Sequence, residues 1–405
     1  MKKRIFIAMH YMEIGGAEIS LIGLLQALDY SKYDVDLFIY SHQGELMQFI
    51  PKEVRLLPEI SAYACIERPI KEALKRGQIG IVIGRLMAKW QFDLYAKRKK
   101  PGDITAVFQY VMNYVTPFLP SLKKMGVYDV AISYLTPHNI VAKKVNALKK
   151  IAWIHTDYST IDVNEELEQP IWDSYDKIVS ISEETAKAFV SCFPSLKEKV
   201  IMIENILSPV FVKQRAELIS KEEISNDISR GQDNVIMLSV GRIVYQKNYD
   251  NVPTICRMII ELGLKVKWYI IGFGIDEQLV RKKIEEEGMQ KHVILLGKRS
   301  NPYPYIKACD IYVQPSRYEG KSVTVREAQM LGKPVVVTDY NTARSQIENG
   351  VDGVIVPRDN EGCAKGIAFF IRDKELRTKI MKNLMARDYG NEKEINRLYK
   401  IIESV

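Results

Sequence analysis

The sequence has few cysteines, and none of them is placed for a disulfide framework or a zinc site. The 405 residues include only five, scattered along the chain as Cys65, Cys192, Cys256, Cys309 and Cys363. No two form a C-x-x-C pair, so we expect neither paired thiols nor a structural zinc. This pattern is typical of a protein of the reducing cytoplasm.

Long apolar runs are also missing. No stretch approaches the ~20 consecutive apolar residues that a membrane-spanning helix needs. The first apolar run, residues 5–9, ends at His10 and is too short for the core of a secretory signal. We therefore expect a first β-strand there.

What the sequence has is a soluble, basic composition. Hydrophobic residues make up 47% and charged residues 27% of the chain, as in globular proteins. The net charge of +8 favours an anionic partner: a nucleic acid, a membrane surface or a phosphorylated substrate.

Short strand-like runs alternate with helix-like stretches in two series. The first series has strands at 4–9, 34–40, 128–135, 150–155 and 176–182, and the second at 234–241, 267–272, 292–297, 310–315 and 334–339. Such alternation is typical of parallel sheets with helices on both faces. The predicted fold class is α/β, with two doubly wound, Rossmann-like domains at 1–207 and 234–385 joined by a polar linker at 208–233.

Residues 61–104 form a distinct basic segment of helical period that also contains Trp90 and Tyr95. Three acids, Glu72, Asp93 and Asp103, stand against nine cations: Lys71, Lys75, Arg76, Arg85, Lys89, Lys97, Arg98, Lys99 and Lys100. One interpretation is an amphipathic surface that lies on an anionic membrane. The other is a helical pair packed on the first domain with a solvated basic face, and both stay open.

Three loops that follow strands carry candidate binding residues. The Gly15–Gly16 turn brings backbone amides and a helix N-terminus close to an anion, or is a plain turn. Arg242 and Lys247 follow a second-domain strand and suit a diphosphate, or are two exposed cations. His155 follows a first-domain strand, where open α/β sheets bind ligands. No G-x-S-x-G motif supports a hydrolase triad, so His155 is interpreted as an oxygen-contacting group.

The stretch 314–338 holds two acids, Glu319 and Glu327. The run 322–331 predicts a helix with Ser322 as its N-cap, so Glu319 and Gly320 lie in the loop before it and Glu327 lies within it. Ala328 beside Glu327 implies close packing, and a partly buried carboxylate there needs hydroxyl or cationic partners.

These residues resemble the retaining glycosyltransferases of family 4, which have the two-domain GT-B fold. The similarity rests on an ordered set of motifs: GGAE, WIHTDY, IENI, VGRIVYQKNYD, YIIGFG, ILLG, PSRYEGKSVTVREAQMLGKPVV and GVDGVIVP. The set spans nearly the whole chain, although 43–125 matches no pattern of the family. After VVVTD the chain reads YNTARSQIENG, where many members have a Gly-rich turn and a Glu.

The resemblance implies a role for each candidate residue. Arg242, Lys247 and the Gly15–Gly16 turn would hold the donor diphosphate. Glu327 would bind the ribose, and Glu319 and His155 would contact the transferred sugar. The remaining donor contacts would come from the loop after Gly320, namely Lys321, Ser322 and Val323, and from the base-flanking pair Lys298 and Arg299. A last helix in 386–405 would return to the first domain.

The implied reaction moves a sugar from a nucleoside diphosphate to a glycan or lipid-linked hydroxyl with retention of configuration. The resemblance implies UDP as the donor nucleotide, with GDP as the alternative, and no metal or cofactor. It places the chain among bacterial capsule, lipopolysaccharide or exopolysaccharide enzymes of the cytoplasm, and it implies peripheral contact with an anionic membrane.

Three other functions remain open. A GT-B epimerase would share the fold and the nucleotide-sugar ligand, and a phosphorylase would need a pyridoxal phosphate lysine. A non-catalytic nucleotide-sugar or nucleic-acid binding protein is the third. Nucleic acid is disfavoured, because the basic residues of 71–100 lack a recognisable reading module.

Overall fold

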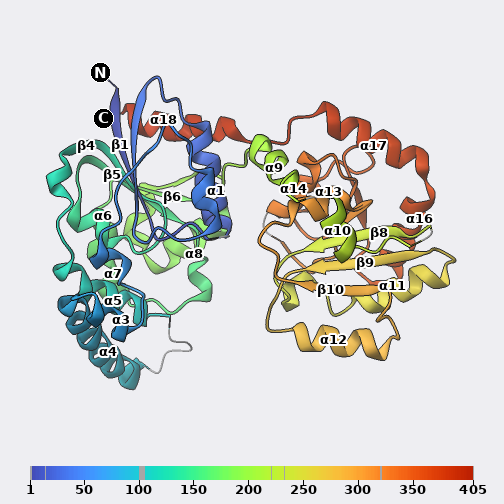
Figure 1. Cartoon of the computed structure of the whole chain (residues 1–405), viewed down its shortest axis with the longest axis horizontal. Coiled ribbons are helices and arrows are strands. Elements are labelled where there is room, and N and C mark those ends of the chain that lie inside the picture. The colour runs from blue at the N-terminus through green and yellow to red at the C-terminus, as the bar shows by residue number, and fades with distance from the viewer. Residues whose placement is uncertain are drawn as a thin grey trace. The chain divides into compact units, whose positions relative to one another are not determined.

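The structure is a computed structural model that describes residues 2–13, 15–99, 105–219, 221–231, 233–319 and 322–404. The chain divides into two compact units, one of residues 1–207 with 391–405 and one of residues 208–390. Among the described residues, no helix combines the length and apolar character needed to cross a bilayer. Figure 1 labels the elements of both units.

The first unit is built on a seven-stranded parallel sheet of order β3-β2-β1-β4-β5-β6-β7. The central strand β1 has the fully buried run Ile5 to Met9, as expected where helices cover both faces of a sheet. The strands are β1 (Lys3–Met9), β2 (Tyr33–Ile39), β3 (Arg55–Leu56), β4 (Val127–Ser133), β5 (Asn146–Ile154), β6 (Lys177–Ser180) and β7 (Val200–Met202).

Nine described helices belong to this unit. They are α1 (Gly16–Ala27), α2 (Ser61–Ala64), α3 (Ile70–Lys75), α4 (Ile79–Lys99), α5 (Val107–Val115), α6 (Asn139–Lys144), α7 (Glu165–Asp173), α8 (Glu183–Cys192) and α18 (Ile395–Glu403). Helices α3, α4 and α5 lie at the opposite end of the unit from α18 (Figure 1).

The last helix, α18, completes the first unit. Its apolar face buries Ile395, Leu398, Ile401 and Ile402. Lys3 Nζ donates to the Ile402 carbonyl at 3.0 Å, and the Tyr399 hydroxyl accepts from the Asp29 amide at 2.8 Å. The chain therefore returns to its first strand after leaving the second unit.

The second unit is built on a six-stranded parallel sheet of order β10-β9-β8-β11-β12-β13. The strands are β8 (Val235–Val240), β9 (Val266–Ile271), β10 (Val293–Gly297), β11 (Ile311–Gln314), β12 (Val335–Thr338) and β13 (Val354–Val356). The described helices are α9 (Pro209–Ala216), α10 (Lys221–Asp227), α11 (Val252–Glu261), α12 (Glu277–Glu286), α13 (Tyr303–Ala308), α14 (Val323–Met330), α15 (Ala343–Gln346), α16 (Asn360–Arg372) and α17 (Lys374–Ala386).

The segment 208–233, expected as a linker, instead begins with two helices of the second unit. Ser208 caps α9 by accepting a hydrogen bond from the Phe211 amide, and Pro209 occupies the first helical turn. Phe211, Val212 and Ala216 are buried where α9 packs against α13 and α14. Lys213, Gln214, Glu222 and Glu223 of these helices are exposed, whereas Arg215 is buried.

Candidate functional site

Both sheets reverse their strand order once, and several of the residues singled out in the sequence follow the strands at these points. In the second unit the chain reverses between β8 and β11, and in the first between β1 and β4. In open α/β sheets, ligands bind outside the carboxyl ends of the strands at such a point. Arg242 and Lys247 follow β8, and Glu319 follows β11.

Lys247 and Glu319 form a partly buried ion pair at the second-unit reversal point. Lys247 Nζ lies 2.7 Å from Glu319 Oε1, and the two side chains are 15% and 6% exposed. The same oxygen also accepts from Ser316 Oγ at 2.6 Å and from Gln314 Nε2 at 3.0 Å. A buried pair is tolerated only when such bonds satisfy its polar atoms, so this cluster is held in one geometry.

The other carboxylate oxygen of Glu319 is less occupied. Glu319 Oε2 accepts one hydrogen bond, from Gln246 Nε2 at 3.2 Å, among the residues that the structure describes. A carboxylate offers about four acceptor positions in total. Oε2 therefore retains capacity for a hydroxyl donor.

Arg242 differs from Lys247 in being exposed. Its guanidinium has no hydrogen bond or ion pair with any residue in the described part of the chain. It begins the loop that also carries Lys247. At the reversal point the Lys247 ammonium is thus already paired, whereas the Arg242 guanidinium is available. Its forked donors suit an anionic oxygen group.

The loops after β8 and β11 are fastened to each other. Asn248, in the left-handed region at φ 61°, donates from Nδ2 to the Pro315 carbonyl at 2.9 Å. The Arg317 amide donates to the Gln246 carbonyl, and its side chain pairs with Asp250 at 2.7 Å. These bonds pre-organise the Lys247–Glu319 cluster.

Two glycines let the loop after β9 approach the loop after β8. A Cβ at Gly272, whose φ is +153°, would lie 1.8 Å from the Gly241 carbonyl oxygen. A Cβ at Gly274 would lie 2.1 Å from the Ile243 carbonyl oxygen. Any larger residue at these positions would push the Arg242 loop away from its place.

Glu327 is buried in α14, as its packing beside Ala328 predicts. Its Oε1 accepts a 2.6 Å hydrogen bond from the Tyr303 hydroxyl. Burial raises the pKa of Glu327 to about 7, against the opposing effects of the Tyr303 hydroxyl and of Arg215. The sequence did not indicate Tyr303 or Arg215 as its neighbours.

The loop expected to contact the donor is described only in part. Gly320 and Lys321 lie outside the described residues. Ser322 precedes α14 as predicted, but its hydroxyl makes no capping bond, and its amide donates to Gln346 Oε1 at 3.0 Å. That amide is therefore engaged by protein in this structure, and Val323 begins the helix.

Arg299 is likewise engaged within the protein. It donates to Tyr305 Oη and Asp227 Oδ2, both at 3.1 Å, so its guanidinium holds α10 against α13. Its neighbour Lys298 is exposed, with Nζ 5.5 Å from the centre of the Phe273 ring. Lys298 is thus the more available of the two.

In the first unit, the Gly15–Gly16 turn begins α1 but faces a carboxylate. A Cβ on Gly15 would lie 2.2 Å from Glu18 Oε2, whereas a Cβ on Gly16 would meet nothing within 4 Å. Burial raises the pKa of Glu18, which is 7% exposed. The place predicted for a phosphate is therefore lined by an acid of the chain itself.

His155 lies at the end of β5 beside a cavity of about 350 Å³. His138, Trp153 and Glu168 also line this cavity. Burial lowers the pKa of His155 to about 4, and its Nε2 has no partner in the described part of the chain. The imidazole is therefore neutral at pH 7 and has a ring nitrogen available for a hydroxyl.

His138 and Glu168 were not among the sequence candidates. His138 Nδ1 and Ser133 Oγ share a hydrogen bond of 2.9 Å. Burial lowers the pKa of His138 to about 3. Burial raises the pKa of Glu168 to about 7. Their signal in the sequence was weak, since neither stands directly after a predicted strand.

No group of three or more His, Cys, Asp or Glu side chains within the described ranges is arranged to hold a metal ion. The sequence does contain an Asp-x-Asp pair at Asp34 and Asp36 of β2. Asp36 forms an ion pair with Arg55 and accepts from the Tyr128 hydroxyl at 2.7 Å, while Asp34 lies 3.7 Å from Lys2 Nζ.

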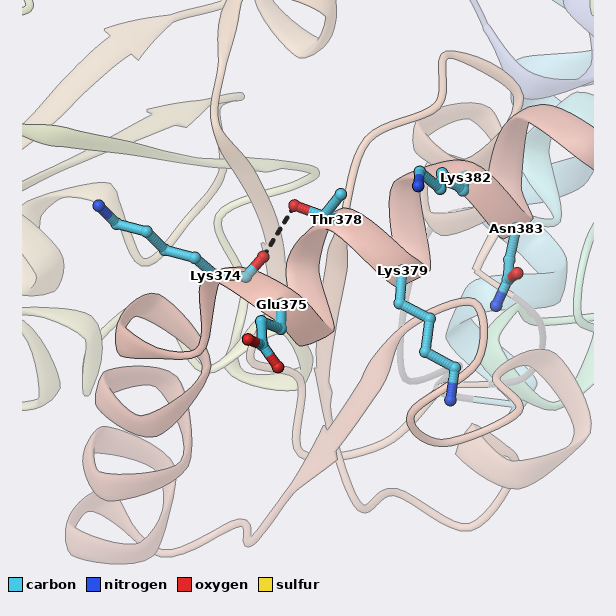
Figure 2. Close-up of a pocket in the computed structure, with 6 residues that line it drawn as sticks. All are labelled: Lys374, Glu375, Thr378, Lys379, Lys382 and Asn383. Atoms are coloured by element: carbon cyan, nitrogen blue, oxygen red, sulfur yellow. Dashed lines mark hydrogen bonds between the residues drawn. The ribbon is translucent and has the colours of Figure 1, made fainter.

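A further hollow lies on the surface of the second unit along α17. It has a volume of about 460 Å³ and is lined by Lys374, Glu375, Thr378, Lys379, Lys382 and Asn383. Figure 2 shows that the three lysine side chains point in different directions, so they do not converge on a common ligand position. We assign no function to this hollow.

Comparison with known proteins gives a family match in the second unit. Residues 220–387 match the family model described as glycosyl transferases group 1. An uncharacterized glycosyltransferase of Methanocaldococcus jannaschii is 28% identical over 173 residues, which is 42% of each chain. A Campylobacter jejuni N-acetylgalactosamine-N,N'-diacetylbacillosaminyl-diphospho-undecaprenol 4-alpha-N-acetylgalactosaminyltransferase is 32% identical over 149 residues, 36% of this chain and 40% of its own. The chain thus spans about two fifths of the length of these relatives.

A solved structure matches over the full length of both chains. Anabaena Alr3699/HepE in complex with UDP and glucose superimposes with a TM-score of 0.61 at 16% identity, covering 100% of each chain. The predicted fold class, two Rossmann-like domains of the GT-B type, is confirmed. Residues 220–387 are thus similar to the glycosyl transferases group 1 family, and the whole chain shares the two-domain fold of the Anabaena structure.

Proposed function

We propose that this protein is a retaining glycosyltransferase that moves a sugar from a UDP-sugar to a hydroxyl of a glycan or lipid-linked acceptor. The observation that carries the proposal is the Lys247–Glu319 pair beside the exposed Arg242 at the strand-order reversal. The names of two similar proteins support it: one acts on a diphospho-undecaprenol acceptor, and the other is bound to UDP and glucose. A role in bacterial surface polysaccharide synthesis follows from the lipid-linked acceptor.

In this reaction the bond between the anomeric carbon and the leaving phosphate oxygen breaks. The acceptor oxygen bonds to the same face of that carbon, and the acceptor proton passes to the departing phosphate. Negative charge grows on the leaving diphosphate, where Arg242 and Lys247 stabilise it. Glu319 holds Lys247 in place through Oε1, and its Oε2 accepts a hydrogen bond from a sugar hydroxyl.

The remaining residues bind and orient substrate. Glu327 receives a ribose hydroxyl, and the neutral His155 contacts a hydroxyl of the sugar or acceptor at its available Nε2. We assign no metal or cofactor to the reaction, so a chelator is expected to leave the rate unchanged. All five cysteines are free thiols, which fits the reducing cytoplasm.

Two measurements test the proposal. A thermal-shift screen with UDP, GDP and their sugars should raise the melting temperature with one nucleotide series, because a ligand that binds the folded state stabilises it. Release of free UDP should then require both the donor and a lipid-linked glycan acceptor. Conversion of the donor to its epimer without UDP release would assign an epimerase, and nucleotide binding without turnover would assign a non-catalytic binder.

A further inference from the structure

Helix α4 in the first unit is packed by one face only. Its inner residues Ala88 and Phe92 join a core cluster with Ala106 and Tyr110 of the α5 region. At Gly84 the helix touches α5 so closely that a Cβ would lie 2.7 Å from the Tyr114 carbonyl oxygen. This side of the helix is therefore fixed against the unit, and the opposite side faces solvent.

The solvent side of α4 is apolar where a surface helix is expected to be polar. Ile79, Ile83, Leu86, Met87 and Trp90 are between 43% and 61% exposed. Their spacing of four, three, one and three residues places them on one side of the helix. We call these five residues the α4 face.

Neighbouring elements extend the α4 face. Phe118, in the turn Thr116–Phe118, is 45% exposed, and its ring lies against Gly80 of α4. Leu74 of α3, which precedes α4, is 50% exposed. These exposed apolar residues thus come from three segments, and two of the segments, α3 and α4, lie together at one end of the unit (Figure 1).

Cations surround this surface. Helix α4 contains five basic residues and one acid, Asp93. Lys71, Lys75 and Lys89 are exposed and have no ion pair with any residue in the described ranges. The acid of α3, Glu72, is already paired with Arg68 and Arg76. Basic residues therefore outnumber acids on α3 and α4, and Lys71, Lys75 and Lys89 are available to an anion.

We propose that the α4 face docks on the surface of an anionic lipid bilayer, with the helix lying in the plane of the interface. An apolar stripe bordered by lysines and arginines is the pattern of an interfacial helix, whose side chains enter the headgroup boundary while the cations attract anionic lipids. Trp90, the last residue of the stripe, has the side chain that prefers this boundary. The docking does not depend on the proposed transfer reaction.

The chain provides its own reporter for this docking. The chain has four tryptophans. Trp90 is 61% exposed, and the other three are at most 1% exposed: Trp153, Trp172 and Trp268. Trp90 therefore dominates any change in fluorescence at the surface. The full chain is titrated with vesicles of phosphatidylglycerol and phosphatidylcholine in equal parts, and with vesicles of phosphatidylcholine alone. We expect emission to shift to shorter wavelength and the protein to sediment with the anionic vesicles only.

Variants separate the two contributions. Lys71→Gln/Lys75→Gln/Lys89→Gln should weaken partitioning about a hundredfold, since each surface cation contributes about fivefold. Leu86→Ser/Met87→Ser should weaken it about tenfold or more while leaving α4 folded, because both side chains face solvent. Matched controls on the same unit are Leu148→Ser, at a residue 65% exposed on β5, and Lys187→Gln on α8. Both controls should bind like the unchanged chain.

Three results would overturn the proposal. They are an unchanged Trp90 emission with anionic vesicles, equal binding to both vesicle types, and equal loss in the control variants. A dimer that forms with rising concentration and is lost in Leu86→Ser/Met87→Ser would assign the α4 face to a second copy of the chain instead. Analytical ultracentrifugation without vesicles detects that outcome.

Discussion

The two units share one topology but differ in the chemistry of the point where strand order reverses. In the second unit this point carries full charges: the Lys247–Glu319 pair and the exposed Arg242. In the first unit the loops after β4 and β5 carry two buried imidazoles, and burial lowers the pKa of His138 to about 3 and that of His155 to about 4. Two buried acids, Glu18 and Glu168, lie near these loops. The parallel sheet brings loops together in both cases, and the residues of each loop decide what is bound there.

The physical cause of this difference is the number of hydrogen-bond partners that each region supplies. Around Glu319, three side chains besides Lys247 donate to the carboxylate, so a charge is stabilised despite burial. Around His155 and His138 the neighbours are aromatic. The ring centre of His155 lies 4.9 Å from that of Tyr134, and the ring centre of His138 lies 4.5 Å from that of Trp172. Burial is the largest cause that lowers both pKa values, and it favours the uncharged ring. The charged region of the second unit suits a diphosphate, and the imidazoles of the first unit suit hydroxyl groups.

The largest expected effect comes from breaking the charged pair. Lys247→Met should lower the transfer rate about a thousandfold, by loss of charge stabilisation at the leaving group. It should also destabilise the fold by about 3 kcal/mol, because Glu319 is left buried without its counter-ion. Initial rates and urea unfolding measure the two effects. The double variant Lys247→Met/Glu319→Gln should regain most of the lost stability but no activity, and failure to regain it would contradict the pairing.

Arg242→Ala isolates charge from stability. The rate should fall about a hundredfold or more by the same electrostatic reasoning. The melting temperature should stay unchanged, since the exposed guanidinium has no partner in the described part of the chain. Lys282→Ala, at an exposed cation of α12 in the same unit, is the matched control and should keep full activity. An equal loss in both variants would show that general surface charge, rather than the reversal point, governs the rate.

Glu327→Gln tests burial in the second unit through pH. The pKa of Glu327 is raised from 4.5 to about 7, so its contribution to stability is present below pH 4.5 and is lost as pH rises through 7. The variant cannot ionise, and its stability relative to the unchanged chain should therefore increase by about 3 kcal/mol between pH 4.5 and 8. Thermal unfolding across this range measures it. A constant difference would mean that Glu327 keeps an ordinary pKa.

His155→Gln tests burial in the first unit, where the pKa shift has the opposite sign. The pKa of His155 is lowered from 6.5 to about 4, so stability is present above pH 6.5 and is lost as pH falls through 4. As the pH falls from 6.5 to below 4, the unchanged chain should lose up to about 3 kcal/mol more unfolding free energy than the variant does. Glu168 is retained in both proteins, and its titration cancels in the comparison. Parallel acid unfolding curves would contradict a buried neutral imidazole.

The smallest effect is expected at Arg299. Its guanidinium is bound to Asp227 and Tyr305, so Arg299→Ala should change the KM for the donor by less than about twofold while lowering stability by about 1 kcal/mol. Lys298→Ala, beside it, removes an exposed cation and is the matched variant. A tenfold rise of KM in Arg299→Ala would restore the base-flanking role that the sequence resemblance implies.

The sequence predicts most of the central sheet but not its edges. The ten predicted strands correspond to β1, β2, β4, β5, β6 and β8 to β12, whose apolar runs are long enough to show a pattern. Strands β3, β7 and β13 have only two or three residues, so no periodicity marks them. Helices α9 and α10 were missed because polar and charged residues interrupt their apolar residues within short elements.

The candidate site shows a similar limit. The sequence places Arg242, Lys247 and Glu319 in loops after strands, which follows from local pattern. It does not indicate that Lys247 and Glu319, 72 residues apart, form one ion pair, because that contact depends on the strand order of the folded sheet. The engagement of Ser322 by Gln346 and of Arg299 by Asp227 is non-local in the same way.

The return of α18 to the first unit has a consequence for synthesis on the ribosome. Residues 208–390 are continuous, so the second unit has all of its chain as soon as Gly390 emerges. The first unit must wait for Ile395 to Ile402 to close its core, and its contact between Lys3 and Ile402 joins residues 399 apart. Contacts of such separation form late. The second half of the chain is thus expected to finish folding before the half that was made first.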